Sequence, residues 1–125
     1  MVTISGLVVR GEGYGRKLGF PTANIDRRQY VASKQKIRQG IYAGTVMLPN
    51  GKQYRAGIVI GPADSKGLPK LEAYLLNYSG NLYGKKLMFR LVKFLRPFKP
   101  YTSESLLRKQ IASDITKIKQ LTLPA

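Results

Sequence analysis

Two segments, residues 41–48 and 53–60, flank the tripeptide Pro49-Asn50-Gly51, and this arrangement constrains the fold more than any other feature of the chain. Asn-Gly between two strand-like segments is the strongest short-range indication of a β-hairpin. A hairpin joins neighbouring strands that run in opposite directions, so the two segments are predicted to pair antiparallel. The fold must therefore contain an antiparallel sheet.

Further strand-like segments extend this pattern. Residues 2–9 alternate and are rich in β-branched side chains, residues 71–77 and 86–95 are expected to pair with each other, and a short strand is expected near residues 20–25. Closing so many short strands into one sheet removes the exposed edges. A chain of 125 residues has the size of one domain. We therefore predict a mainly β fold, a small closed antiparallel barrel, as a single domain over residues 1–125.

One helix is expected at the C-terminal end. A hydroxyl of Thr102 or Ser103 can cap it, and Glu104 in its first turn complements the helix dipole. Apolar residues then recur at spacings of four, four and three: Leu107, Ile111, Ile115 and Ile118. The spacing predicts one apolar face, and packing against the barrel is favoured over binding of a partner.

Cysteine and histidine are both absent from the chain. Their absence excludes a disulfide framework and the usual transition-metal sites, so any metal is expected to be a hard ion held by oxygen atoms. No apolar run is long enough to cross a membrane, and strand-like residues at the very start leave no room for a signal peptide. A cytoplasmic protein without membrane contact is expected.

The net charge of +16 by itself indicates an anionic partner such as RNA, DNA or a membrane surface. The basic residues are scattered in singles and pairs, however, which weakens that interpretation. Eight tyrosines and four phenylalanines keep one version of it open, because small barrels bind single strands by stacking bases on aromatic side chains. A basic barrel that binds RNA or single-stranded DNA stays the alternative function.

Residues 11–24, G-E-G-Y-G-R-K-L-G-F-P-T-A-N, have the composition of a loop that approaches an anion. The spacing fits neither the P-loop nor the dinucleotide-binding fingerprint. Pro21 favours extended backbone, which presents Thr22 and Asn24 on one side of the chain. One hydroxyl and one amide oxygen would suit Mg²⁺ bound together with a nucleotide. By residue type alone, the interpretation of Thr22 as only a turn residue is favoured.

Without histidine, general acid–base chemistry by the commonest side chains would have to rely on six carboxylates. Only Glu72 falls inside a predicted strand, where it shares a face with Tyr74 and Leu76. A carboxylate in such apolar company lies either on the solvent face or at a site. Strand geometry alone favours the solvent face.

Several of these motifs, taken together, resemble the ATP-dependent riboflavin kinases, or flavokinases. The P-T-A-N tetrapeptide at residues 21–24 is highly specific to that family. Further matching motifs follow in the family's order: G-L-V-V-R-G at 6–11, G-I-Y-A-G at 40–44, L-E-A-Y-L-L-N at 71–77, L-Y-G-K at 82–85 and F-L-R-P at 94–97. The resemblance covers nearly the whole chain and implies a six-stranded Greek-key barrel with a C-terminal helix.

The resemblance also implies roles for individual residues. Glu72 would be the catalytic base, and Thr22 and Asn24 would hold Mg²⁺ with the nucleotide. The expected nucleotide-binding residues are Gly11, Arg16, Thr22, Asn24, Leu75, Asn77 and Tyr83. The expected flavin-binding residues are Arg96, Lys99 and Tyr101, although a solvated basic turn is the competing explanation for Arg96 and Lys99. Two positions depart from the family pattern, with Tyr74 in place of the customary His and Phe98 in place of Glu.

The implied reaction is phosphorylation of riboflavin at its ribityl 5′-hydroxyl by MgATP, which yields FMN and ADP. The expected partners are riboflavin and ATP, and nucleic acid is not expected. The family also includes bifunctional proteins, so an adenylyltransferase domain in a longer native chain is a further expected partner. A family member that binds flavin without turnover is the other alternative, because of Tyr74 and Phe98.

Overall fold

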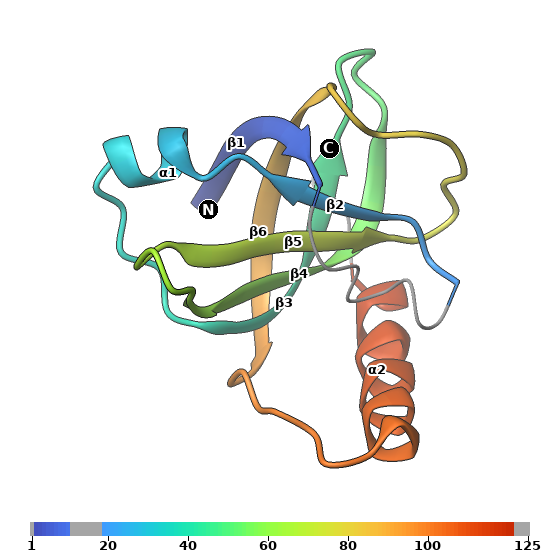
Figure 1. The fold of residues 1–125 in the computed structure, drawn as a ribbon. Helices are drawn as coiled ribbons and strands as arrows, with labels where there is room; N and C mark the ends of the chain where they lie inside the picture. The colour runs from blue at the N-terminus through green and yellow to red at the C-terminus, as the bar shows by residue number, and fades with distance from the viewer. Residues whose placement is uncertain (1, 11–18, 122–125) are drawn as a thin grey trace.

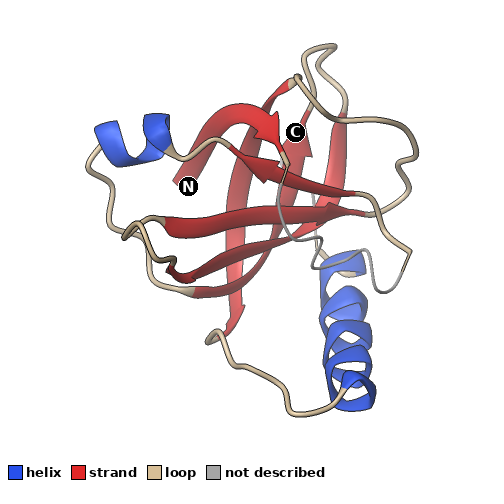
Figure 2. Ribbon diagram, in the orientation of Figure 1, coloured by secondary structure: helices blue, strands red, loops and turns tan. Residues whose placement is uncertain are grey.

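The structure is a computed structural model that describes residues 2–10 and 19–121. Six strands form a closed barrel in the order β1-β2-β5-β4-β3-β6, and all neighbouring strands are antiparallel. The strands are β1 (Val2–Val9), β2 (Thr22–Ile25), β3 (Gly40–Met47), β4 (Gln53–Ala63), β5 (Pro69–Leu75) and β6 (Lys86–Arg96). Two helices, α1 (Arg28–Ala32) and α2 (Glu104–Lys119), lie outside the barrel (Figures 1 and 2). The predicted six-stranded barrel with a C-terminal helix is confirmed.

The predicted hairpin is also confirmed. Strands β3 and β4 pair along their length, from Gly40 opposite Ile60 to Met47 opposite Gln53. The Asn50 side chain accepts a hydrogen bond from the Lys52 backbone N–H at 3.0 Å, and Gly51 has a φ of 86°. A positive φ at this position is what the Asn-Gly pattern predicts for a tight turn.

The expected pairing of residues 71–77 with 86–95 is wrong. Strand β5 pairs with β2 and β4, and β6 pairs with β1 and β3. The intervening residues include Asn77, Gly80 and Gly84 at positive φ, so the chain is turned away from β5 before β6 begins. Closure of the barrel requires β5 to pair with β2, a contact between distant segments that no local turn signal reveals. The short helix α1 was also not predicted.

The barrel buries two separate apolar clusters. The inner core fills the barrel and includes Ile4, Val46, Ile58, Leu75 and Phe89. The outer core lies between the outside of the barrel and α2, where Ile111 and Ile118 are fully buried against the sheet residues Ile41, Val59 and Tyr74. Ser103 caps α2, since its Oγ accepts from the Leu106 N–H at 3.2 Å. The predicted helix and its apolar face are confirmed.

Candidate functional site

The outer face of strands β2 and β5 brings together the polar residues that the sequence singled out. Asn24 lies directly opposite Glu72, and Thr22 lies opposite Tyr74. Residues directly opposite each other in an antiparallel pair project from the same face of the sheet. Between them, Ala23 projects into the barrel and is fully buried. Thr22 and Asn24 therefore lie on one side of an extended chain, as predicted.

Glu72 is fully buried, although it projects from the outside of the barrel. Its neighbour on the other side is Val59 of β4, which is also fully buried. The Lys70 Nζ lies 3.4 Å from the Glu72 Oε2 and provides a positive charge at the carboxylate. A buried carboxylate is tolerated where such a partner compensates the loss of water. The solvent-face interpretation of Glu72 is therefore wrong, because this part of the outer face is covered.

Two hollows are lined by different residues of β2. The first, which we call the Asn24 hollow, has a volume of about 430 Å³ and is lined by Arg10, Asn24, Arg27, Asp64, Lys70 and Phe98, among others. The second, the Thr22 hollow, has a volume of about 540 Å³ and is lined by Phe20, Thr22, Tyr78, Asn81, Leu82 and Tyr83, among others. The Arg10 guanidinium carbon lies 6.0 Å from the centre of the Tyr83 ring, so the two hollows approach each other there. Glu72 does not line either hollow, but its strand partner Asn24 and its ion-pair partner Lys70 both line the first one.

The Asn24 hollow carries an excess of positive charge. Arg10, Arg27 and Lys70 line it, and Asp64 is its one carboxylate among the described lining residues. Asp64 is already engaged, since the Arg27 Nη1 donates to it at 2.6 Å. The Leu68 backbone N–H and the Arg27 guanidinium lower the pKa of Asp64 below its ordinary value. The hollow thus offers cationic and amide groups to an anion such as a phosphate.

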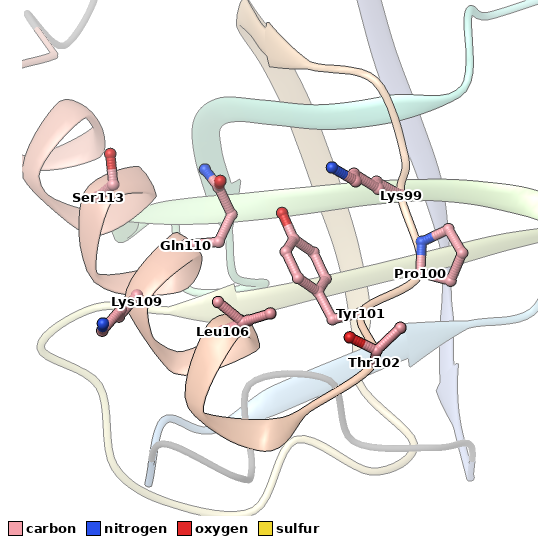
Figure 3. A pocket seen from close by; sticks show the side chains of 8 residues that line it. All are labelled: Lys99, Pro100, Tyr101, Thr102, Leu106, Lys109, Gln110 and Ser113. Atoms are coloured by element: carbon pink, nitrogen blue, oxygen red, sulfur yellow. The ribbon is translucent and has the colours of Figure 1, made fainter.

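A third hollow, the Tyr101 hollow, lies between the segment that follows β6 and helix α2. It has a volume of about 510 Å³ and is lined by residues that include Lys99, Tyr101, Leu106, Lys109 and Gln110. Figure 3 shows the Tyr101 ring between Lys99 and Gln110, with Leu106 of α2 below it. An aromatic ring, two ammonium groups and an amide around one space would suit a planar ligand that carries polar or anionic substituents.

Arg96 fixes the end of β6 to α2. Its Nη2 lies 2.9 Å from the Oδ2 of Asp114, which is fully buried and also accepts from the Gln110 Nε2 at 3.2 Å. The Arg96 guanidinium carbon lies 5.7 Å from the centre of the Tyr101 ring. The solvated-turn interpretation is therefore wrong for Arg96, whose side chain is 13% exposed. Lys99 is exposed and lines the Tyr101 hollow.

The expected nucleotide-binding residues are only partly brought together. Tyr83 is 47% exposed and lines the Thr22 hollow. Asn77 is exposed in the turn after β5, with a φ of 60°. Leu75 is fully buried in the inner core, so its side chain lines neither hollow, although its backbone N–H donates to the Pro21 carbonyl at 3.0 Å. The expectation of a lining side chain at Leu75 must therefore be corrected. Gly11 and Arg16 lie outside the described residues.

Sequence reasoning missed Arg10, Arg27 and Lys70 as residues of this site. Lys70 carried a usable signal, because it stands two positions before Glu72 and therefore shares its face of the strand. Arg10 and Arg27 reach the same hollow from the ends of β1 and β2, which only the closed barrel brings together. Within residues 2–10 and 19–121, no three side chains of the His, Cys, Asp or Glu type gather into a metal-binding cluster. The described part of the chain also contains no helix that is long and apolar enough to cross a membrane.

Comparisons with known proteins bear on this site. A family model described as riboflavin kinase (Flavokinase) matches residues 1–122. The RNA-binding riboflavin kinase RibR of Bacillus subtilis (strain 168) is 34% identical over 120 residues, which make up 93% of this chain and 49% of that protein. The bifunctional riboflavin kinase/FMN adenylyltransferase of Buchnera aphidicola subsp. Schizaphis graminum is 34% identical over 94% of this chain and 38% of its own length.

A relative of more similar length is the riboflavin kinase of Mus musculus, which is 33% identical over 95% of this chain and 80% of that protein. Among solved structures, the crystal structure of riboflavin kinase from Trypanosoma brucei superimposes with a TM-score of 0.65 at 24% identity, over 94% of this chain and 74% of that one. This likeness shows a shared fold. The chain spans about half the length of the B. subtilis relative and less of the Buchnera one.

Proposed function

Because this chain belongs to the riboflavin kinase family, we propose that it transfers the γ-phosphoryl group of ATP to the ribityl 5′-hydroxyl of riboflavin, giving FMN and ADP. The observation that carries the proposal is the position of Glu72. It is a fully buried carboxylate, paired with Lys70, directly opposite Asn24 of the P-T-A-N segment. This is a suitable place for a group that accepts or orients the proton of an attacking hydroxyl.

We assign the two substrates to different hollows. The nucleotide occupies the Thr22 hollow, where Tyr78 and Tyr83 offer aromatic surface for a base and Thr22 lies near the phosphates. The attacking hydroxyl approaches through the Asn24 hollow, which is lined by Asn24 and Lys70, the strand partner and the ion-pair partner of Glu72. The cations Arg10, Arg27 and Lys70 then surround the point where negative charge develops during transfer. Electrostatic stabilisation and positioning supply most of the catalysis in this class of reaction.

The residues present fit a magnesium ion. Thr22 and Asn24 alternate with the buried Ala23, so one hydroxyl and one amide oxygen project to the same side of β2, and both residues are partly exposed. Mg²⁺ usually takes few ligands from the protein and the rest from phosphates and water. When bound, the ion neutralises charge on the phosphate oxygens. Thr22 and Asn24 are the residues that would hold it.

The isoalloxazine side of riboflavin is assigned to the segment after β6. Lys99 and Tyr101 line the Tyr101 hollow, and Phe98 turns to the other side and lines the Asn24 hollow. Arg96 contributes through its ion pair with the buried Asp114, which holds this segment against α2. Its proposed role is therefore to shape the flavin side, with Lys99 and Tyr101 in contact with the ligand.

The wider setting of the protein belongs to the same proposal. The bifunctional relative carries its kinase in a protein that is also named an FMN adenylyltransferase, and this chain covers 38% of it. We propose that an adenylyltransferase domain is a partner if the native chain is longer. The cytoplasm is the proposed location.

The assay that tests the function is incubation of the chain with riboflavin, ATP and Mg²⁺, followed by chromatographic separation of the flavins. FMN is expected only when nucleotide and metal are both present. Thr22→Ala should raise the Mg²⁺ concentration that gives half-maximal rate by about tenfold, because one of two protein ligands is lost. An unchanged dependence of the rate on Mg²⁺ concentration would show that Thr22 is only a turn residue and does not hold the metal. Flavin binding without FMN would identify a binding protein that lacks turnover.

A further inference from the structure

A fourth hollow lies at the start of β3 and the end of β6 and shares no lining residue with the other three. It has a volume of about 240 Å³, and we call it the Arg38 hollow. Three of its residues are cations, namely Lys36 and Arg38 from the segment between α1 and β3 and Lys93 from β6. In Figure 1 this segment descends from α1 on the left of the view, while α2 stands at the lower right. Its charge belongs to a surface that the proposed kinase reaction does not use.

The Arg38 guanidinium lies over an aromatic ring. Its carbon lies 4.1 Å from the centre of the Phe94 ring, and the Tyr42 ring meets Phe94 edge-on at 5.1 Å. The Phe94 ring packs directly against the backbone of Gly40, where an added Cβ would lie only 2.4 Å from the Phe94 Cε2. Arg38 is exposed, so its side chain stays accessible from solvent. A planar cation supported in this way can stack on a nucleobase.

The backbone around Arg38 is also held in place. The Tyr42 hydroxyl donates to the Arg38 carbonyl at 2.7 Å, and the Ile37 N–H donates to the hydroxyl of the buried Tyr30 at 3.3 Å. A loop held by such contacts loses less conformational entropy when it binds a ligand. Burial raises the pKa of the Tyr42 hydroxyl further above neutrality.

Acidic residues lie elsewhere and are already neutralised. Of the six carboxylates, Glu12 lies outside the described residues, and the other five each form an ion pair: Asp26 with Arg28, Asp64 with Arg27, Glu72 with Lys70, Glu104 with Arg108 and Asp114 with Arg96. No carboxylate lines the Arg38 hollow among the described residues. Lys36, Arg38 and Lys93 therefore present positive charge that no described acidic side chain compensates, which attracts a polyanion.

From this combination we infer that the Arg38 hollow and its rim bind single-stranded nucleic acid. Phosphates would contact Lys36 and Lys93, and one unpaired base would stack on the Arg38 plane. A duplex would not offer an unpaired base to stack on Arg38, because its bases are already stacked on each other. An anionic membrane would use the charge but not the planar platform. RNA and DNA strands share the required chemistry, so both are tested.

The experiment measures fluorescence anisotropy of labelled single-stranded RNA and DNA oligonucleotides against the full chain. Saturating MgATP is present, so that an oligonucleotide cannot bind in the Thr22 hollow and contribute to the measured anisotropy. We compare the triple variant Lys36→Gln/Arg38→Gln/Lys93→Gln with the triple variant Lys66→Gln/Lys117→Gln/Lys119→Gln. The second removes the same charge from three exposed lysines outside the Arg38 hollow. Circular dichroism verifies that both variants are folded.

We expect the first triple variant to lose about tenfold in affinity near 0.15 M salt and to lower the slope of log K against log salt by about 1.4, since the two phosphate-contacting cations, Lys36 and Lys93, each contribute about 0.7. The control triple variant should lose less than about threefold. Arg38→Lys, which keeps the charge and removes the plane, should weaken binding by about fivefold. RNA-specific, DNA-specific or equal binding would each support the site and identify its strand.

Equal losses in the two triple variants would overturn the inference, because binding would then follow the overall charge. An Arg38→Lys variant that binds as well as the unmodified chain would remove the stacking platform from the argument and overturn it as well. Binding of the chain and of both triple variants to vesicles that contain anionic lipid is measured as well. Binding to vesicles that depends on Lys36, Arg38 and Lys93, without binding to either strand, would assign the surface to a membrane instead.

Discussion

The two faces of strand β5 are both buried, but different parts of the molecule cover them. Leu71, Ala73 and Leu75 project into the barrel and belong to the inner core. Tyr74, and Leu76 just after the end of the strand, belong to the outer core beneath α2, and the fully buried Glu72 lies on the same side as Tyr74. Alternation in a sequence shows which side chains share a face. Whether that face meets water or a second layer depends on elements distant in the chain.

The two faces also differ in what they require of their neighbours. The inner face needs apolar volume, which many combinations of residues supply. The outer face carries a buried carboxylate and a large aromatic ring, and each has a specific counterpart. The Lys70 Nζ lies 3.4 Å from the Glu72 Oε2. The Tyr74 ring fills the space beside Gly57, where an added Cβ would lie only 2.1 Å from the Tyr74 Cζ. Function and specificity should therefore depend on the outer face, and stability on both.

The largest expected effect comes from Glu72→Gln. This change keeps the size of the side chain and removes the group that accepts a proton, so turnover should fall by about 10² to 10⁴-fold. Nucleotide binding should persist, because the Thr22 hollow is not altered. Rates of FMN formation and calorimetric titration with a non-hydrolysable ATP analogue would measure the two quantities separately.

Asp64→Asn is the matched control for this change. Asp64 is also a carboxylate in an ion pair and lines the Asn24 hollow, but its side chain is 37% exposed and it is not next to Asn24 in the sheet. The control should keep turnover within about fivefold, the range of a partly exposed ion pair. If Glu72→Gln were as active as this control, Glu72 could not be the base.

The inner face is tested by Leu75→Ala, which should lower the free energy of unfolding by about 3 kcal/mol through the cavity that it leaves. Urea denaturation measures this loss. Leu7→Ala on β1 is the control, because Leu7 is 50% exposed and its truncation should cost less than about 1 kcal/mol. The Michaelis constant for ATP of the folded variant should be unchanged. A large rise in that constant would indicate that Leu75 contributes to the nucleotide site after all.

A smaller effect is expected where Tyr74 meets Gly57. Gly57→Ala should cost about 1–3 kcal/mol, because the new methyl group overlaps the Tyr74 ring and the ring is enclosed by the outer core. In a Tyr74→Leu background the same change should cost almost nothing, and the difference is read from a double-mutant cycle by urea denaturation. Equal costs in both backgrounds would show that the ring is not the obstacle.

Much of the fold was predictable from local patterns. The strand at Val2–Val9, the β3–β4 hairpin and the capped helix at Ser103 each follow from neighbouring residues alone. The partner of β5 was not predictable, because it depends on closure of the barrel. Local turn signals favoured pairing with β6, but contacts between distant segments determine the order of the strands.

The site divides in the same way. Thr22 and Asn24 could be placed on one face because Pro21 extends the chain. Burial of Glu72 could not be predicted, since its neighbours Asn24 and Val59 come from two other strands. The scattered basic residues gave no indication that Lys36, Arg38 and Lys93 line one hollow. Residues that approach through the tertiary fold leave no periodic signal in the sequence.

The smallest expected effect distinguishes the buried carboxylate of β5 from an accessible one at the end of β2. The Arg28 side chain and backbone N–H lower the pKa of Asp26 from its ordinary 3.8 to about 2. A lowered pKa in the folded state stabilises the protein above the ordinary value, and this contribution is lost as the pH falls from 3.8 towards about 2. The Asp26→Asn variant should therefore be slightly less stable than the unmodified chain at neutral pH. Its free energy of unfolding should also change less with pH between 3.8 and about 2. Urea denaturation of both proteins between about pH 5 and about pH 2 measures the difference, and parallel curves would show that the Asp26–Arg28 pair does not contribute. Because Glu72 is retained in both proteins, any acid sensitivity that they share belongs to other carboxylates, including the buried one on β5.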